Sequence, residues 1–241
     1  MKPDSQNIIF FLRPLYGVMQ GRSMPLMVSL FILLLFYPLF ESPANTLPDW
    51  PARVLFAIVP ISGVVVLHGQ RWSFFSLIIL GLLVLFCDSF PNIAIGSFMF
   101  WLRALAAVAM YGFCTVLIIR SVFIRDDLKD HPVYGGITGY LLIGVTFAII
   151  YTVIYEIDPR AFHVAEPVRH VHEDMLPFGD LIYYSFICQT TLGIGDITPV
   201  NPFARSVSVI QAILGVMYPT VLIAQLILSP TSRMKSLNPV D

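Results

Sequence analysis

The sequence predicts an all-α membrane protein with six transmembrane helices and a short re-entrant helix between the fifth and the sixth. The 241 residues are 57% hydrophobic and only 12% charged, whereas soluble domains carry about 25% charged residues. Several apolar runs approach the roughly 20 residues that a helix needs to cross a bilayer core. A further apolar run is too short to cross and ends in glycines. Most of this chain therefore has no surface that faces water.

Five segments meet or approach the length and apolarity of a span, and a sixth does so if its polar groups face a helix bundle. The first is not predicted to be a cleaved signal peptide, because it starts late and no small-residue cleavage site follows it. The second and third are joined by only a few residues, so their boundaries are soft. In chain order the spans are Met24–Phe40, Arg53–Leu67, Trp72–Phe90, Ser97–Phe123, Tyr134–Tyr155 and Phe203–Leu228.

The placement of lysine and arginine predicts that both termini are cytoplasmic, since cytoplasmic loops carry an excess of these residues. With that orientation nine basic residues lie inside, four lie outside, and Arg103 falls within a span. The inside residues are Lys2, Arg13, Arg22, Arg71, Arg120, Arg125, Lys129, Arg233 and Lys235, and the outside residues are Arg53, Arg160, Arg169 and Arg205.

A charged stretch from Arg125 to Pro132 divides the chain into two predicted domains. Residues 1–125 contain an N-terminal cytoplasmic segment and four spans. Residues 126–241 contain the last two spans and a short cytoplasmic tail. The three cysteines lie in apolar stretches without a neighbour at metal-ligand spacing, so we expect small core residues rather than disulfides or a zinc site.

Between the last two spans, the run Leu181–Leu192 is far too short to cross a bilayer. It starts near Pro177 and Asp180, which are typical of a helix start. It is followed by Gly193-Ile194-Gly195-Asp196. Glycine-rich backbone at membrane depth is tolerated only where it faces water or protein. The pattern therefore predicts a re-entrant loop.

The stretch from Tyr183 to Pro199 resembles the pore helix and selectivity filter of potassium channels. The familiar Thr-Val-Gly-Tyr-Gly-Asp reads here Thr191-Leu192-Gly193-Ile194-Gly195-Asp196. The resemblance covers roughly Tyr134–Leu228, and Arg205 and Gly215 also fall where that family often has an arginine and a hinge glycine. An ordinary turn is the competing interpretation of Gly-Ile-Gly-Asp, and the upstream helix and flanking spans argue against it.

The chemistry of such a filter accounts for these residue types. Rings of backbone carbonyls from four subunits replace the water shell of the ion. We therefore predict that K+ is coordinated by the carbonyls of Thr191, Leu192, Gly193 and Ile194, with Gly195 completing the filter and the Thr191 hydroxyl adding a lower ring. Alternating unusual backbone angles are required, and glycine adopts them at no steric cost. One loop per chain cannot enclose an axis, so the resemblance implies a homotetramer.

Position 194 departs from the familiar pattern. A tyrosine there ties the filter to the surrounding helices through its hydroxyl, and Ile194 can only pack. Tyr183 and Tyr184 replace the usual aromatic pair, and we expect them to support the filter together with Thr190 and Asp196, one tyrosine bonding to Asp196. A less tethered filter admits a second interpretation, a non-selective cation channel.

The last span contains Gly215 and, four residues later, Pro219. Proline removes one helical hydrogen bond and clashes with the carbonyl four residues back. We therefore predict a kink and consider a gating hinge at these two residues. We further expect that Gly215→Ala changes opening but leaves selectivity untouched.

The first four spans occupy the place of a voltage sensor without its chemistry. A sensor needs about 3–4 gating charges per subunit on one helix, and the fourth span holds only Arg103 within the membrane. A structural ion pair, with Asp88 as the candidate partner, or an arginine that snorkels outward is favoured over voltage sensing. The outer loop carries six acidic and histidine residues that either bind a metal or proton or are simply solvated: His163, Glu166, His170, His172, Glu173 and Asp174.

The sequence thus predicts a tetrameric potassium channel of the plasma or bacterial inner membrane, with K+, lipid and three further copies of itself as partners. No cofactor is expected. A non-conducting membrane adaptor is the alternative from another class. No nucleophile–base set suggests an enzyme, and a net charge of −1 gives no reason to expect nucleic-acid binding.

Overall fold

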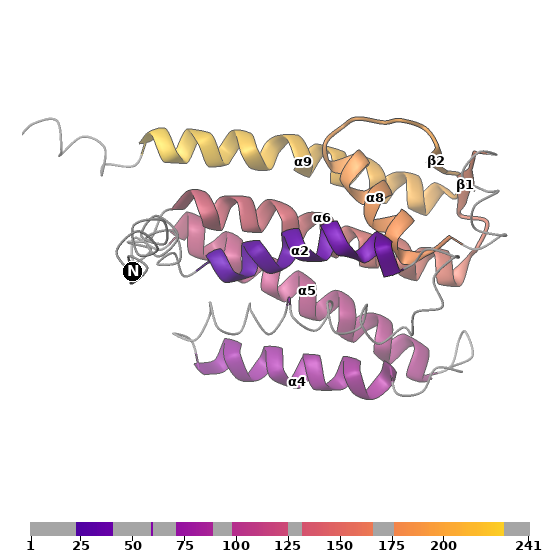
Figure 1. Cartoon of the computed structure of the whole chain (residues 1–241), viewed down its shortest axis with the longest axis horizontal. Coiled ribbons are helices and arrows are strands. Elements are labelled where there is room, and N and C mark those ends of the chain that lie inside the picture. Colours follow the sequence, from indigo (N-terminus) through magenta and orange to yellow (C-terminus); the bar gives the residue numbers. More distant parts are fainter. Residues whose placement is uncertain are drawn as a thin grey trace, which may run out of the picture.

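The computed structural model describes residues 23–40, 59, 71–88, 98–124, 132–165 and 176–228. These residues form six helices and a two-stranded sheet (Figure 1). The helices are α2 (Met24–Phe40), α4 (Arg71–Asp88), α5 (Phe98–Ile124), α6 (Pro132–Ile157), α8 (Phe178–Gln189) and α9 (Pro202–Leu228), and the strands are β1 (Phe162–Val164) and β2 (Ile197–Pro199).

Five of the six predicted spans coincide with helices to within a few residues. Among the described residues, α5, α6 and α9 are long and apolar enough to cross a membrane, while the described parts of α2 and α4 give shorter apolar helices. The predicted span Arg53–Leu67 lies outside the described residues except for Val59, which is buried in the core. The protein is therefore a mostly helical membrane protein, and the count of six spans stays a prediction.

Helix α6 is the centre of the bundle. It contacts α2, α5, α8 and α9, whereas α4 packs on α5. Within its most apolar stretch 67% of α6 is buried, against 22% for α9. The long side chains of the core come mainly from α2, α5 and α6. Helix α9 is thus the spanning helix that the single chain leaves least covered.

Glycines on α6 allow its neighbours to approach closely. A Cβ on Gly144 would lie 2.5 Å from the Phe186 ring of α8, and a Cβ on Gly136 or Gly139 would meet Leu222 or Tyr218 of α9. Small residues at helix contacts let backbones come together where lipid supplies no hydrophobic driving force. The position of α8 and α9 on α6 therefore depends on these glycines.

Helix α8 is short and slants between α6 and α9 (Figure 1). It begins after Pro177, whose extended backbone with φ −69° provides the N-cap, and proline suits a helix start because its lack of an N–H costs nothing there. Asp180 in the first turn complements the helix dipole. The apolar run predicted over Leu181–Leu192 is helical only through Gln189, and the remaining residues belong to the segment that follows.

A small antiparallel sheet was not predicted from the sequence. It pairs Phe162 with Pro199, His163 with Thr198 and Val164 with Ile197. The sheet joins the chain that leaves α6 to the chain that enters α9, at one end of the bundle (Figure 1). The residues between α8 and β2 are consequently held at both of their ends.

Candidate functional site

The predicted filter segment, Thr191–Asp196, runs from the end of α8 to the start of β2. At its first end, the amides of Thr191 and Leu192 donate to the carbonyls of Cys188 and Ile187, both at 3.1 Å. At its other end, the carbonyl of Asp196 accepts a 2.8 Å bond from the amide of Ala165. The segment is therefore fixed to the helix before it and to the sheet after it.

The sign of the backbone angle φ alternates along this segment. Thr191, Gly193 and Gly195 have φ of 59°, 56° and 86°, and the intervening Leu192 and Ile194 do not have positive φ. Glycine adopts positive φ freely, while Thr191 does so at a cost of about 1–2 kcal/mol. Three left-handed residues at every second position agree with the sequence-based expectation of unusual angles at alternate positions.

The whole segment is open in the single chain. The residues from Thr191 to Gly195 are all exposed, Leu192 to 67% and Ile194 to 61%. A Cβ built on Gly193 or Gly195 would meet no atom within 4 Å. Close packing inside this chain is therefore not the reason for glycine at these two positions; their backbone angles are.

Tyr183 supports the outer end of the segment. Its hydroxyl donates a 2.6 Å hydrogen bond to Oδ2 of Asp196, while Oδ1 of the same carboxylate accepts the amide of Ile197 at 2.9 Å. The bond to the Asp196 carboxylate raises the pKa of Tyr183 to about 12. The prediction that one of the two tyrosines bonds to Asp196 is confirmed.

Tyr184 makes its side-chain hydrogen bond to α9 rather than to Asp196, and the prediction that it supports the filter remains untested. It is buried, its hydroxyl shares a 2.7 Å hydrogen bond with Ser208 of α9, and its ring packs edge-on against Tyr151 and Phe162. Neighbouring residues on a helix point about 100° apart, which agrees with the different hydrogen-bond partners of Tyr183 and Tyr184. Thr190 likewise turns its hydroxyl back to the carbonyl of Phe186.

Gly215 is a contact position at the base of the segment. A Cβ there would overlap the carbonyl oxygen of Gln189, and would lie 2.8 Å from the carbonyl carbon and 3.0 Å from the Cα of that residue. Because Gln189 is the last residue of α8, we now expect Gly215→Ala to disturb the end of this helix, and its effect on selectivity stays a prediction. Pro219 lies inside α9, which continues to Leu228, and a hinge at Gly215 and Pro219 stays a prediction.

Two polar side chains of α8 hold this helix against α6. They were not assigned to the site from the sequence. Ser185 donates to the carbonyl of Gly144 at 2.7 Å, and Gln189 donates to the carbonyl of Tyr140 at 2.7 Å. Both are buried. Polar residues inside a short apolar run were the available signal, because membrane interiors hold such groups only when they are hydrogen-bonded.

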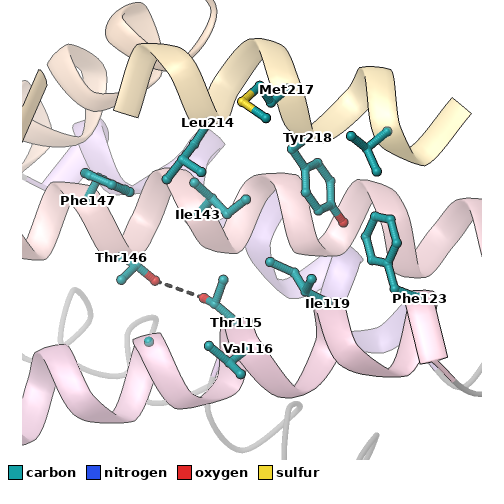
Figure 2. Close-up of a pocket in the computed structure, with 12 residues that line it drawn as sticks. Thr115, Val116, Ile119, Phe123, Ile143, Thr146, Phe147, Leu214, Met217 and Tyr218 are labelled. Carbon is teal, nitrogen blue, oxygen red and sulfur yellow. Dashed lines mark hydrogen bonds between the residues drawn. The ribbon is translucent and has the colours of Figure 1, made fainter. Parts of the chain in front are cut away.

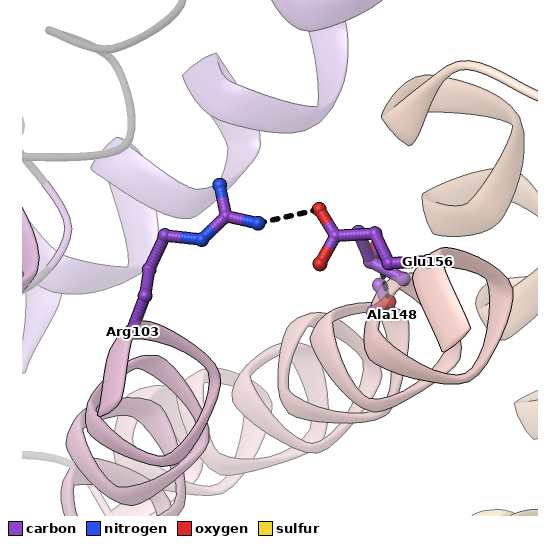
Figure 3. A network of polar contacts seen from close by, with 4 residues as sticks. Arg103, Ala148 and Glu156 are labelled. Atoms are coloured by element: carbon purple, nitrogen blue, oxygen red, sulfur yellow. Dashed lines mark hydrogen bonds and ion pairs between the residues drawn. The ribbon is translucent and has the colours of Figure 1, made fainter. Parts of the chain in front are cut away.

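Arg103 forms an ion pair with Glu156, at 2.6 Å between its Nη2 and Oε1 of the carboxylate (Figure 3). The pair joins the first turns of α5 to the last turn of α6, and both side chains are about one-third exposed, at 34% and 31%. The structural ion pair is confirmed with a different partner, and the side chain of Asp88 lies outside the described residues. Arg103 thus sits near the end of the bundle rather than deep within it.

An open apolar groove of about 440 Å³ lies between α5, α6 and α9. Figure 2 shows Thr115 and Thr146 hydrogen-bonded to each other at its floor, at 3.0 Å, with Met217 and Tyr218 above them. Each threonine hydroxyl also lies within donating distance of a carbonyl of its own helix, Tyr111 for Thr115 and Leu142 for Thr146, both at 2.7 Å. No charged side chain is among the residues that line this groove.

The loop between α6 and α8 is described only in part. His163 is exposed on β1 opposite Thr198, and the described residues contain no group of three potential metal ligands. Glu166, His170, His172, Glu173 and Asp174 lie outside the described residues. Cys114 and Cys188, whose side chains are described, are free thiols within the bundle.

Comparison with protein families gives one match. Residues 139–229 match a family model described as an ion channel. The matched stretch contains most of α6, all of α8 and α9, and the predicted filter segment. No curated protein and no solved structure matches the chain.

The family match supports an ion-channel pore in this part of the chain, and hence passive ion conduction rather than enzymatic chemistry. The matched residues include the segment in which the sign of φ alternates. Helices α2, α4 and α5 and the first residues of α6 fall outside the match.

Proposed function

We propose that this protein is one subunit of a homotetrameric, potassium-selective channel of the cell membrane with cytoplasmic termini. The observation that carries the proposal is the alternating left-handed backbone at Thr191, Gly193 and Gly195. In a regular strand successive carbonyls point to opposite sides of the chain. Reversing the sign of φ at every second residue turns consecutive carbonyls toward one side, where they replace the hydration shell of an ion.

The coordinating oxygens in this proposal are the carbonyls of Thr191, Leu192, Gly193 and Ile194, with Gly195 completing the turn toward Asp196. Backbone oxygens carry partial negative charge and favour a cation without the tight hold of a carboxylate. That balance suits conduction, because binding must be favourable enough for entry and weak enough for exit.

Four copies around one axis are supported by what the single chain leaves uncovered. The filter segment is exposed from Thr191 to Gly195, and α9 presents a large apolar surface that includes Val209, Ile213 and Val216. A closed cyclic assembly buries such surfaces and places the exposed carbonyls of each subunit next to the same carbonyls of its neighbours. The carbonyl end of each α8, which carries about −0.5 charge, would then face the axis and favour a cation there.

The decisive experiment is a reversal-potential measurement on the purified full-length protein in liposomes, with K+ on one side and Na+ on the other. The proposal predicts a current that reverses near the K+ equilibrium potential. Gly193→Ala should abolish the selective current, because alanine is strained at φ 56° although space is open around it. Gly81→Ala on α4 is the matched control, since its Cβ makes only an ordinary contact, 3.8 Å from Met110 Sδ.

A non-selective cation channel is the second candidate, favoured by the apolar, 61% exposed Ile194, which has no hydroxyl to tether the segment. Reversal near zero under the same gradients would establish it in place of the selective channel. Absence of any current from correctly assembled tetramers would favour the non-conducting adaptor.

A further inference from the structure

Gln189 is the last residue of α8, and only Thr190 separates it from the segment that we propose coordinates K+. Its side chain is only 1% exposed. The amide nitrogen donates to the carbonyl of Tyr140 on α6 at 2.7 Å. The backbone carbonyl of Gln189 accepts a longer bond, 3.4 Å, from the hydroxyl of the same tyrosine. Helix α6 therefore holds this residue by both its side chain and its main chain.

Gln211 of α9 reaches the same residue from the other side. It is fully buried, and its amide nitrogen donates to Oε1 of Gln189 at 3.3 Å and to Oγ of Ser185 at 2.7 Å. Its amide oxygen accepts a 2.7 Å bond from the hydroxyl of Tyr151, which is itself fully buried. One glutamine on α9 thus binds two residues of α8 and one of α6.

The direction of this amide is fixed by its neighbours. The Tyr151 hydroxyl already donates to the oxygen of Gln211, so the nitrogen faces α8, where Ser185 and Gln189 offer oxygens. A buried amide that loses a partner in an apolar bundle keeps the cost of its desolvation. Fully satisfied buried networks therefore specify one arrangement of the elements that they join.

A further contact between Gln189 of α8 and helix α9 lies one turn beyond Gln211. There the backbone at Gly215 touches the main chain of Gln189, four residues beyond Gln211. An amide contact and a backbone contact on successive turns meet the same residue. They restrain both sliding and rotation of the end of α8 relative to α9.

We propose that Gln189 and Gln211 are positioning residues that couple the place of α9 to the conformation of the ion-coordinating backbone. The proposal rests on the proposed channel function. A shift of α9 displaces the Gln211 amide and, through Gln189, moves Thr190 and Thr191 at the base of the filter segment. Opening movements of α9 would in this way alter ion coordination as well as the width of the pore.

The test replaces Gln211 by methionine, which keeps the length of the side chain and removes its hydrogen bonds. Full-length tetramers are reconstituted in liposomes and studied by single-channel recording in K+ and in K+/Na+ mixtures. We expect the ratio of conducting to non-conducting time to fall about fivefold, the equivalent of one net hydrogen bond, and the preference for K+ over Na+ to weaken. Gln225→Met is the matched control, because it removes an amide of the same helix that donates to the carbonyl of Phe123 of α5 at 3.3 Å.

A second set of variants separates positioning from packing. Gln189→Met should lower the ratio of conducting to non-conducting time in the same direction as Gln211→Met. Because both variants remove the bond between the two glutamines, the loss in the double variant should be smaller than the product of the two single losses. Multiplicative loss in the double variant overturns the coupling. Tyr151→Phe removes only a hydroxyl and weakens the network in a chain that retains its ring packing, so it serves if Gln211→Met fails to assemble.

The outcomes distinguish the two proposals. If the wild-type tetramer conducts K+ selectively, and Gln211→Met and Tyr151→Phe both match Gln225→Met, the positioning role is wrong and the channel function stands. If the wild-type tetramer does not conduct or does not prefer K+, the proposed function fails before any variant is compared.

Discussion

The phenolic hydroxyl of Tyr183 lies 2.6 Å from Oδ2 of Asp196 and donates a hydrogen bond to it. The two residues flank the predicted filter segment, one on α8 and the other beside β2. Because Ile194 has no hydroxyl, this bond is the tether that the described part of the chain provides between α8 and the outer end of the segment. Its strength should decide how long the segment keeps a conducting shape.

Replacing Tyr183 by phenylalanine should therefore shorten sustained conduction. A charge-assisted hydrogen bond contributes about 1.5–3 kcal/mol, and this pair is partly exposed, so we expect the lower part of that range. The measurement is the decay of K+ current after opening. Tyr184→Phe is the matched control, since its hydroxyl bonds to Ser208 away from the segment. Equal decay in both variants would show that the Asp196 tether is unimportant.

The pH dependence of this tether follows from the pKa of Tyr183, which is raised to about 12 by its bond to Asp196. A raised pKa means that folding favours the protonated phenol. The contribution is fully present below the ordinary tyrosine pKa of about 10 and is lost as pH rises through about 12. The difference in current decay between wild type and Tyr183→Phe should thus be constant from pH 7 to pH 9. A difference that vanishes by pH 9 would contradict this assignment.

Gly215→Ala should impair ion selectivity together with opening. The added methyl group overlaps the carbonyl of Gln189, and overpacking of this kind costs about 1–3 kcal/mol, which exceeds the roughly 1 kcal/mol that alanine adds in helix propensity. The permeability ratio and the thermal stability of the tetramer are measured side by side. Gly81→Ala should stabilise slightly and leave the current unchanged. A selective Gly215→Ala channel with altered opening would restore the simple hinge interpretation.

Neutralising the ion pair of α5 and α6 should leave voltage dependence nearly unchanged. A charge that crosses the full field contributes about 2.3 kcal/mol per 100 mV, but Arg103 is held near one end of the bundle by Glu156. We expect Arg103→Gln to have the same conductance–voltage slope as wild type. The loss of stability should not exceed about 1 kcal/mol, because the pair is about one-third exposed. Glu156→Gln is the matched variant, and a large slope change in Arg103→Gln alone would indicate a moving charge.

Ile194→Tyr should retain conduction, because the coordinating oxygens in our proposal are backbone atoms and the Ile194 side chain is exposed in the single chain. Within the same chain, the hydroxyls of Tyr183 and Tyr184 are already bonded to Asp196 and Ser208, so any stiffening must come from a neighbouring subunit. The permeability ratio of K+ to Na+ is the measurement. We expect it to be at least that of wild type, and a lower ratio would argue against the proposed tetrameric packing.

The sequence by itself determined the local features of this protein. The apolar runs set the extents of α2, α4, α5, α6 and α9 to within a few residues, because a spanning helix must satisfy its own backbone. The glycines at 193 and 195 marked the positive φ values, since that preference belongs to the residue itself. Helix extents and positive φ values both depend on residues that are close together in the sequence.

Only the tertiary structure decided which residues meet across the bundle. It paired Arg103 with Glu156 rather than with Asp88, divided the roles of Tyr183 and Tyr184, and joined Gln189 to Gln211. It also showed that Gly215, which we considered as a hinge, lies against the main chain of Gln189 in α8. These pairings depend on how helices far apart in the sequence are rotated and spaced, and on the close approach that small residues allow. A pattern of hydrophobicity along one chain does not contain that rotation.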